Sequence, residues 1–334
     1  MLGKISQAAR DAALQEMMRA SLDPKLTAAI GQLKKWGDDS RRTQRKAQQR
    51  PPVLYQYTGG AGLKGIIETH QVWLTNVFDM NDPSEFMHGI KYAAEYIMEV
   101  RQTGSLAVQA FCDWMLPILS PPFGDDFGMF VASFSDADDD LGQWRAYANN
   151  GRGYALGFSS KEFPEEESGD IIPGGVCALA RVNYSKASFQ DLQKEAIQKA
   201  VSILTETEKL LVDNLEAQRF HFLAALGFQL AVPIFWNSLT TKHEAYANEK
   251  EHRLVVLGTG LDFNNYIQTR LQGDRIVPYV AVPLTKGADH WLKSVRVRPA
   301  ASAGAELGVD VLLRTSQIDH PNIVTRSTIP YRAL

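Results

Sequence analysis

The sequence predicts an α+β protein, with a sheet of mixed or antiparallel strands and helices inserted between the strands. Strand-like segments occur in runs, and the helices do not alternate with them in the regular way of a parallel α/β fold. The chain of 334 residues is 45% hydrophobic and 10% aromatic, which is enough apolar material for a large core. A folded chain of one or two domains is therefore expected.

The first 50 residues differ from the rest of the chain. They hold 11 Lys and Arg against 5 Asp and Glu, although the whole chain has a formal net charge of -3. Asp23 and Pro24 are typical of a helix start and predict a helix over about 24–37, after which the segment DDSRRTQRKAQQRPP is expected to be a polar linker. We therefore expect a basic helical extension and linker over 1–50, and an α+β domain over 51–334.

The role of this extension stays open between several alternatives. It could dock on the rest of the chain, mediate self-association, or contact nucleic acid or an acidic partner through its basic side chains. An immunity or delivery partner is a further alternative.

The elements of the α+β domain follow one another with recognisable boundaries. Runs of β-branched and aromatic residues bounded by turn residues predict strands at VLYQYT, VWLTN, GMFVASFS, GYALGFS, twice within 173–184, and at HRLVVLG, IVPYVAVPL, LKSVRVRP and NIVTRSTIPYR. Helical spacing predicts helices at AGLKGIIETH, from Pro83 to about Arg101, over 105–119, at DDLGQWRAYANN and at GAELGVDVLLRT. Interleaved leucines and charges predict a helical insertion over about 189–232.

Several classes of protein are disfavoured. The two cysteines and seven histidines have no metal-ligand spacing, and neither a Walker A motif nor the GxGxxG fingerprint is present. We find no continuous apolar run of the ~18 residues that a membrane span needs, and no secretory pattern at the N-terminus. The expectation is a cytoplasmic protein without a membrane partner, with delivery into another cell as the alternative.

The segment EAYANEKEHRLVVL places two carboxylates two residues apart at the expected start of a strand. Alternate residues of a strand share one face, so Glu249, Glu251 and Arg253 are expected side by side. Like charges at this spacing repel each other and cost stability. Arg253 can offset only part of this repulsion, and its alternative role is to bind a phosphate. The segment is thus either a solvated strand start or a site where carboxylates meet a cationic transition state.

Two further segments are candidates. In MNDPSEF, Asp82, Pro83 and Glu85 fit a helix capping box, and the alternative is that Asn81 or Glu85 faces a ligand. In QWRAY, Trp144 and Tyr147 share one helix face, where they either join the core or stack on a planar ring.

Five segments, in this order, carry a family resemblance: LYQYT with GLKGIIE, FDMNDPSEF, FSDADDDLGQWRAYANNGRGYALGF, KHEAYANEKEHRL and STIPYR. Over roughly residues 52–332 the chain resembles a large bacterial family of unknown function. Members of that family share an NDPxE turn, a WxxYA segment and an ExExR strand. The first 50 residues lie outside this resemblance.

The order of these segments is also similar to the ADP-ribosyltransferase fold, in which NAD binds in a split sheet beside a His-Tyr-Glu or Arg-Ser-Glu triad. LYQYT resembles the first-strand motif L-(W/Y)-H-(G/Y)-(T/S), with Gln56 in the position of the histidine. The resemblance implies that Gln56, Tyr57 and Thr58 contact NAD. It further implies that Tyr147 is the middle tyrosine and Glu251 the triad carboxylate. Gln56 departs from the pattern, although its amide can still hydrogen-bond ribose hydroxyls.

This resemblance implies roles for the paired carboxylates. Breaking the nicotinamide–ribose bond develops oxocarbenium character, which Glu251 is expected to stabilise while it hydrogen-bonds a ribose hydroxyl. Glu249 is expected to orient or deprotonate the acceptor. Asn81, Trp144, Tyr147 and Arg253 are the further NAD contacts that we expect, with Tyr147 and Trp144 on the nicotinamide ring.

The implied function is an NAD-dependent ADP-ribosyltransferase-like enzyme that transfers ADP-ribose to a macromolecular acceptor or hydrolyses NAD. NAD is its substrate and no metal is expected. A toxin, effector or phage-defence protein is the expected biological setting. One alternative is a non-catalytic relative that binds a nucleotide or a protein, which Gln56 favours. Another is a metal-dependent hydrolase or nuclease that uses Glu85, Glu249 and Glu251.

Overall fold

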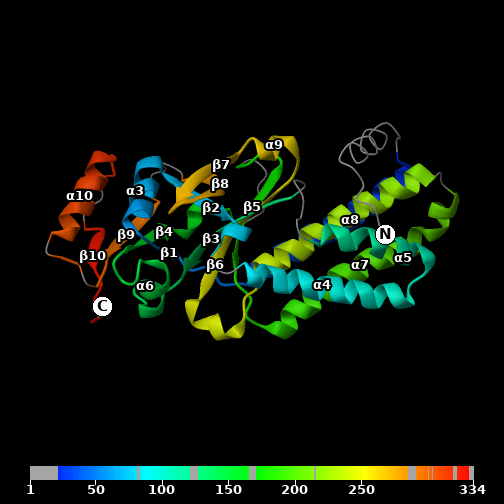
Figure 1. Ribbon diagram of the computed structural model, residues 1–334, viewed down its shortest axis with the longest axis horizontal. Coiled ribbons are helices and arrows are strands. Elements are labelled where there is room, and N and C mark those ends of the chain that lie inside the picture. The colour runs from blue at the N-terminus through cyan, green and yellow to red at the C-terminus, as the bar shows by residue number, and fades with distance from the viewer. Residues whose placement is uncertain are drawn as a thin grey trace. The chain divides into compact units, whose positions relative to one another are not determined.

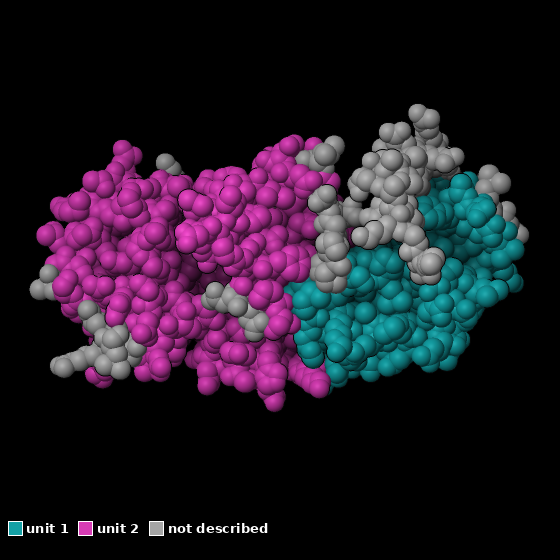
Figure 2. All heavy atoms as spheres, in the orientation of Figure 1, with its two compact units in different colours: residues 1–43, 86–124, 187–238 teal, residues 44–85, 125–186, 239–334 magenta. Residues whose placement is uncertain are grey.

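The computed structural model describes residues 22–80, 83–120, 127–164, 171–213, 216–284, 291–299, 301–302, 304–318 and 322–330. The chain divides into two compact units, each assembled from three separate stretches of sequence (Figure 2). Unit 1 comprises residues 1–43, 86–124 and 187–238, and unit 2 comprises residues 44–85, 125–186 and 239–334. We describe each unit by itself.

Unit 1 is built from long helices (Figure 1). Its residues come from α2 (Pro24–Lys46), α4 (Ser84–Thr103), α5 (Leu106–Ile118), α7 (Lys186–Asp213) and α8 (Glu216–Leu239). Helix α8 is central, because small or polar residues bring the others against it. Gly37 of α2 faces Pro233, Gly89 of α4 faces Ser238, and Gly227 faces Met115 of α5.

Helix α8 is more apolar than we expected of any segment. By length and composition it could cross a membrane, although 67% of its most apolar window is buried within the protein. The side-chain amide of Gln193 on α7 donates to Ser238 Oγ at 3.1 Å, so α7 also packs on α8. Contacts with four neighbouring helices give a reason for this apolar composition within the core of unit 1.

The structure groups the N-terminal residues differently from the expected extension and linker. Helix α2 continues through most of the expected linker, to Lys46, and ends only before the Pro51-Pro52 pair. Ion pairs one helical turn apart, such as Asp38–Arg41 at 2.6 Å, support this continuation. Leu26 and Leu33 of α2 are buried, and the described residues 22–43 are grouped with unit 1.

Unit 2 contains the sheet. Its strands are β1 (Val53–Thr58), β2 (Gln71–Asn76), β3 (Gly128–Ser135), β4 (Tyr154–Ser159), β5 (Gly175–Arg181), β6 (Glu251–Gly258), β7 (Ile267–Gln272), β8 (Arg275–Pro283), β9 (Leu292–Val297) and β10 (Val324–Arg326). Its helices are α3 (Gly60–Thr69), α6 (Leu141–Tyr147), α9 (Gly260–Asn264) and α10 (Ala305–Thr315). Short 3-10 helices, η1 (Val77–Asp79), η2 (Ser160–Glu162) and η3 (Glu244–Glu249), complete it.

The ten strands form one mostly antiparallel sheet, which confirms the predicted α+β class. The strand order is β10-β9-β4-β1-β3-β2-β8-β7, and β6 pairs with both β3 and β5. Of the strand pairs in the described residues, β9–β10 is parallel and the others are antiparallel. A buried apolar cluster of side chains from most of these strands, α3 and α10 forms the core.

The sheet forks at β3. One edge of β3 pairs with β6 along its whole length, from Gly128 to Ser135. Its other edge is shared, because β2 pairs at Phe130 and Val131 whereas β1 pairs only at Ser135. Within the described pairings, residues 132–134 have no strand partner on that edge. We call the opening between β1 and β2 the fork, and it is where the sheet leaves space for a ligand.

The structure departs from the local sequence analysis in three places. Residues 173–184 form one strand, β5, instead of two. Strand β7 was not predicted, because its sequence IQTRLQ is mainly polar and exposed and shows no alternation of buried residues. The third concerns Glu249, which lies in η3 and not on the strand with Glu251.

Candidate functional site

A cavity of about 330 Å³ lies in the fork of unit 2. This volume falls within the usual range of small-molecule sites. Its walls come from β1, α3, β2, η1, the start of α4, β3, α6, β7 and the segment around η3 and β6. The lining residues with chemical interest are Gln56, Tyr57, Thr58, Trp73, Thr75, Asp79, Glu85, Ser133, Tyr147, Lys242, Glu249, Glu251, Arg253 and Arg270.

Glu251 and Arg253 lie on the same face of β6, as the alternation of a strand predicts. Arg253 Nε donates to Glu251 Oε1 at 2.8 Å, and Arg253 Nη2 donates to Glu251 Oε2 at 3.1 Å. Both side chains are almost completely buried. The remaining guanidinium nitrogen, Nη1, donates to the Leu239 carbonyl at 2.8 Å. Every nitrogen of Arg253 is therefore engaged, which argues against the expected role in binding a phosphate.

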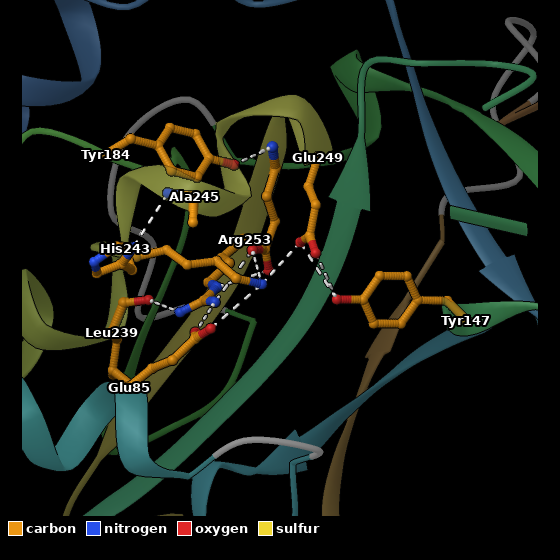
Figure 3. Close-up of polar contacts among 10 residues, drawn as sticks. Glu85, Tyr147, Tyr184, Leu239, His243, Ala245, Glu249 and Arg253 are labelled. Atoms are coloured by element: carbon orange, nitrogen blue, oxygen red, sulfur yellow. Dashed lines mark hydrogen bonds and ion pairs between the residues drawn. The ribbon is translucent and has the colours of Figure 1, made fainter. Parts of the chain in front are cut away.

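Glu249 lines the cavity from η3 and not from the strand on which it was expected. It ends η3, and Lys250 then takes a left-handed backbone conformation (φ 47°) that turns the chain into β6. The carboxylate of Glu249 accepts from the Tyr147 hydroxyl at 3.2 Å and from Lys242 Nζ at 2.8 Å. Figure 3 shows Glu249 and Tyr147 pointing toward each other from opposite sides of this region. The two carboxylates thus converge without sharing a strand.

Lys242 is a residue of this network that sequence reasoning missed. Its ammonium group lies 2.8 Å from Glu249, 3.3 Å from Glu251 and 3.4 Å from Glu85. It follows Thr241, which forms an isolated parallel bridge with Asn183. Its only signal in the sequence was its position at the start of KHEAYANEKEHRL, because no periodicity marks it.

Glu85 brings a third carboxylate into the same network. It lies in the first turn of α4 and accepts from Arg253 Nη2 at 2.9 Å. The carboxylate of Glu85 forms ion pairs with Arg253 and Lys242. Glu85 therefore belongs to the charge network of the candidate site as well as to the first turn of α4. Asn81 and Asp82, the other expected members of this segment, lie outside the described residues.

The protonation states follow from this network. Burial is the largest influence on Glu251 and would raise its pKa, but Arg253 and Lys242 outweigh it and lower the pKa to about 2. Burial works in the opposite direction on Lys242, where Glu251, Glu249 and Glu85 raise the pKa above its usual value. At neutral pH, Glu251 is therefore ionised and Lys242 is protonated.

Tyr147 keeps its proton over the physiological range. Burial raises its pKa to about 12, and the nearby carboxylates act in the same direction while Lys242 opposes them. Its hydroxyl is thus a hydrogen-bond donor to Glu249 at neutral pH.

Two cations already balance most of the charge of the three carboxylates. Lys242 occupies the position between the carboxylates that a divalent ion would need. Among the residues that the structure describes, no group of three or more His, Cys, Asp or Glu side chains is arranged to hold a metal.

Of the expected aromatic pair, only Tyr147 lines the cavity. Trp144 is fully buried, and its indole nitrogen donates to Asp139 at 2.7 Å. Its ring packs edge-on against Tyr57, with 5.1 Å between the ring centroids. In this packing Trp144 holds α6 against β1 and has no free face for a ligand, so its expected stacking role is corrected to a structural one.

The three expected residues of β1 all line the cavity. The side-chain oxygen of Gln56 is buried and has no hydrogen-bond partner within the described part of the chain. The Tyr57 hydroxyl donates to the Ala137 carbonyl at 2.9 Å and accepts from the Asp140 amide at 3.0 Å. Gln56 and Thr58 are therefore better placed to bind a ligand than Tyr57, whose hydroxyl orders the segment before α6.

A match to a known protein family includes some of the residues of this site. A family model described as "Protein of unknown function (DUF2971)" matches residues 143–254. No curated protein and no solved structure matches the chain. The matched stretch runs from α6 to β6, whereas β1, α3 and β7 lie outside it. A DUF2971 domain, of unknown function, is thus found at residues 143–254, the stretch that supplies Tyr147, Lys242, Glu249 and Glu251.

Proposed function

We propose that this protein cleaves NAD in the manner of an ADP-ribosyltransferase, passing ADP-ribose to a macromolecular acceptor or to water. The observation that carries the proposal is the fork cavity, which brings ionised carboxylates and a tyrosine hydroxyl to one wall and an unpaired amide oxygen of Gln56 to the cavity lining. A ribose offers hydroxyl donors to such acceptors, and its oxocarbenium form is a cation.

In the proposed reaction the bond between C1′ of the ribose and the nicotinamide nitrogen breaks, and its electron pair leaves with nicotinamide. Positive charge then develops at C1′, where the fixed negative charge of Glu251 and Glu249 stabilises it. The acceptor forms the new bond to C1′ and gives up a proton, for which Glu249 is the nearest exposed base. Its side chain is 19% exposed, against 6% for Glu251.

Lys242 and Arg253 act in this proposal as positioning residues. They hold three carboxylates within one small volume, which would otherwise repel one another or take up protons. Their own charges leave the five-residue network with a formal charge of about -1, since three carboxylates face two cations. That residual negative charge suits a cationic transition state.

The acceptor, and the role as a toxin, effector or phage-defence protein, belong to this proposal and rest on the fold resemblance. The two alternative functions make different demands on the site from those of NAD cleavage. A metal-dependent hydrolase would need Lys242 to leave the carboxylates, and a non-catalytic relative would bind NAD without releasing nicotinamide.

The test is to incubate the purified chain with NAD in EDTA and to measure free nicotinamide. We expect release by the wild type, and a loss of at least about a hundredfold in Glu249→Gln and in Glu251→Gln, because each removes a charge that acts on the transition state. Glu95→Gln is the matched control, since Glu95 is an exposed residue of α4 outside the cavity. It is expected to keep full activity.

Glu251 is buried, so its variant needs a check of folding. Thermal unfolding of each variant separates lost activity from lost structure, and Glu249→Gln is the milder change because its side chain is partly exposed. NAD bound without nicotinamide release, with or without added cell extract as acceptor, would favour the non-catalytic alternative. Activity that appears only with a divalent ion would favour the hydrolase.

A further inference from the structure

Arg270 is a cation in the lining of the fork cavity. It lies on β7, and its guanidinium is partly buried. Burial lowers its pKa, and the nearby Tyr279 phenol acts in the opposite direction. Within the described residues no carboxylate forms an ion pair with it. A buried charge without a partner is costly, so such a group is a candidate for binding an anion.

The residues around Arg270 hold its guanidinium in place. Arg270 Nη2 donates to Thr75 Oγ1 at 2.8 Å. The guanidinium carbon lies 5.6 Å from the Trp73 ring centroid and 5.9 Å from that of Tyr279. These two rings contact each other, with 4.8 Å between their centroids. The cation therefore sits in a preformed aromatic frame instead of moving freely in solvent.

Two hydrogen-bond donors in this frame are unused. Arg270 Nε and the indole nitrogen of Trp73 are both buried, and neither has an acceptor among the described residues. Both residues line the fork cavity. An unpaired buried donor costs free energy until an acceptor binds to it. Two such donors, one of them on a cation, suit an oxyanion with several acceptor oxygens.

The other charged groups that line the cavity are already paired. Arg253 and Lys242 are bound to the carboxylates of Glu85, Glu249 and Glu251. Asp79 forms an ion pair with Arg275 at 2.5 Å. Among the described residues that line the cavity, Arg270 is thus a cation without a carboxylate partner, and it can bind an anionic ligand.

We propose that Arg270 and Trp73 form an anion subsite of the fork cavity that binds the phosphate groups of a nucleoside diphosphate. A guanidinium presents donors in a fixed plane that matches the oxygens of a phosphate group. The subsite itself does not depend on catalysis. That it holds the diphosphate of NAD, with the ribose toward Glu249, rests on the proposed function.

The test is calorimetric titration of the full chain with ADP, which has no nicotinamide and cannot be cleaved at that bond. Arg270→Gln is expected to weaken ADP binding by at least about tenfold, because it removes a charge-assisted hydrogen bond. Trp73→Phe keeps the ring and loses the indole donor, and a smaller loss is expected. Adenosine, which has no phosphate, is expected to bind the wild type and Arg270→Gln equally.

Arg314→Gln is the matched control, because it removes the same charge from an arginine of α10 outside the cavity. Its ADP affinity is expected to equal that of the wild type. Equal ADP affinity in the wild type and Arg270→Gln, or no ADP binding by the wild type, would overturn the subsite. Binding of ADP that depends on Arg270, without any release of nicotinamide from NAD, would keep the subsite and reject the proposed cleavage.

Discussion

At the scale of single residues, Glu251 shows how this site keeps a charge away from water. Its carboxylate is 6% exposed and binds Arg253 and Lys242. Its backbone amide donates to the Tyr184 hydroxyl at 2.9 Å, which fixes the start of β6 (Figure 3). The carboxylate is stable as an anion only while both cations remain beside it.

The stability of the protein should therefore depend on the protonation of Glu251. Its pKa falls from 4.5 to about 2 on folding, so its stabilising contribution is present above pH 4.5 and is lost as the pH falls toward 2. The shift corresponds to about 3 kcal/mol of unfolding free energy over that window. Urea unfolding between pH 2 and pH 6 measures it.

Glu251→Gln is the variant for this measurement. It should lose about 3–5 kcal/mol at pH 7, because the two buried cations lose a partner, and its stability should change less between pH 5 and pH 2. Glu95→Gln should keep the wild-type profile. An unchanged pH profile in Glu251→Gln would mean that the carboxylate is not the titrating group.

At the scale of elements, glycines at the ends of three strands make room for one ring. Phe263 of α9 is fully buried against Gly128 of β3, Gly175 of β5 and Gly258 of β6. A Cβ atom at Gly258 would lie 2.0 Å from the Phe263 ring, and one at Gly128 would lie 2.1 Å from it. The ring closes the end of β5, β3 and β6 that is remote from Glu251.

Gly258→Ala is expected to destabilise the protein by about 1–3 kcal/mol, because the added methyl group overlaps a ring that cannot move into solvent. Gly308→Ala on the exposed face of α10 is the matched control, since a Cβ there meets nothing within 4 Å. In a helix this change should stabilise by about 0.5–1 kcal/mol. Equal effects of the two changes on thermal unfolding would contradict the packing of Phe263.

At the scale of the whole molecule, each unit is made from three stretches of the chain. The described residues 22–43 are part of unit 1, where α2 contributes Leu26, Ala29 and Leu33 to the buried side chains. Helix α2 therefore contributes to the core of unit 1.

Leu33→Ala tests this part of the architecture. Leu33 is 1% exposed, so its truncation should leave a cavity and cost about 2–5 kcal/mol of unfolding free energy. The neighbouring Gln32 is exposed, and Gln32→Ala should change stability by less than about 0.5 kcal/mol. A Leu33→Ala protein as stable as the control would favour the expected separate extension over 1–50.

Local sequence patterns predicted much of the fold. The strands VLYQYT and HRLVVLG and the helix before GYALGFS were found where their alternation or helical spacing indicated. Strand β7 escaped because an exposed strand at the edge of a sheet has no alternation of apolar residues to mark it. Arg270, which lies on that strand, was missed for the same reason.

The sequence by itself determined the α+β class and the chemical types of the candidate site, namely two glutamates, an arginine and a tyrosine. Only the tertiary structure decided how these groups meet. Lys242 lies between three carboxylates because a bridge at Thr241, a 3-10 helix and β6 bring distant residues together, and no local period encodes such a contact. The tertiary structure also buried Trp144, and among the described residues it left Arg270 without a carboxylate partner, because exposure and pairing depend on the residues that fold around a side chain.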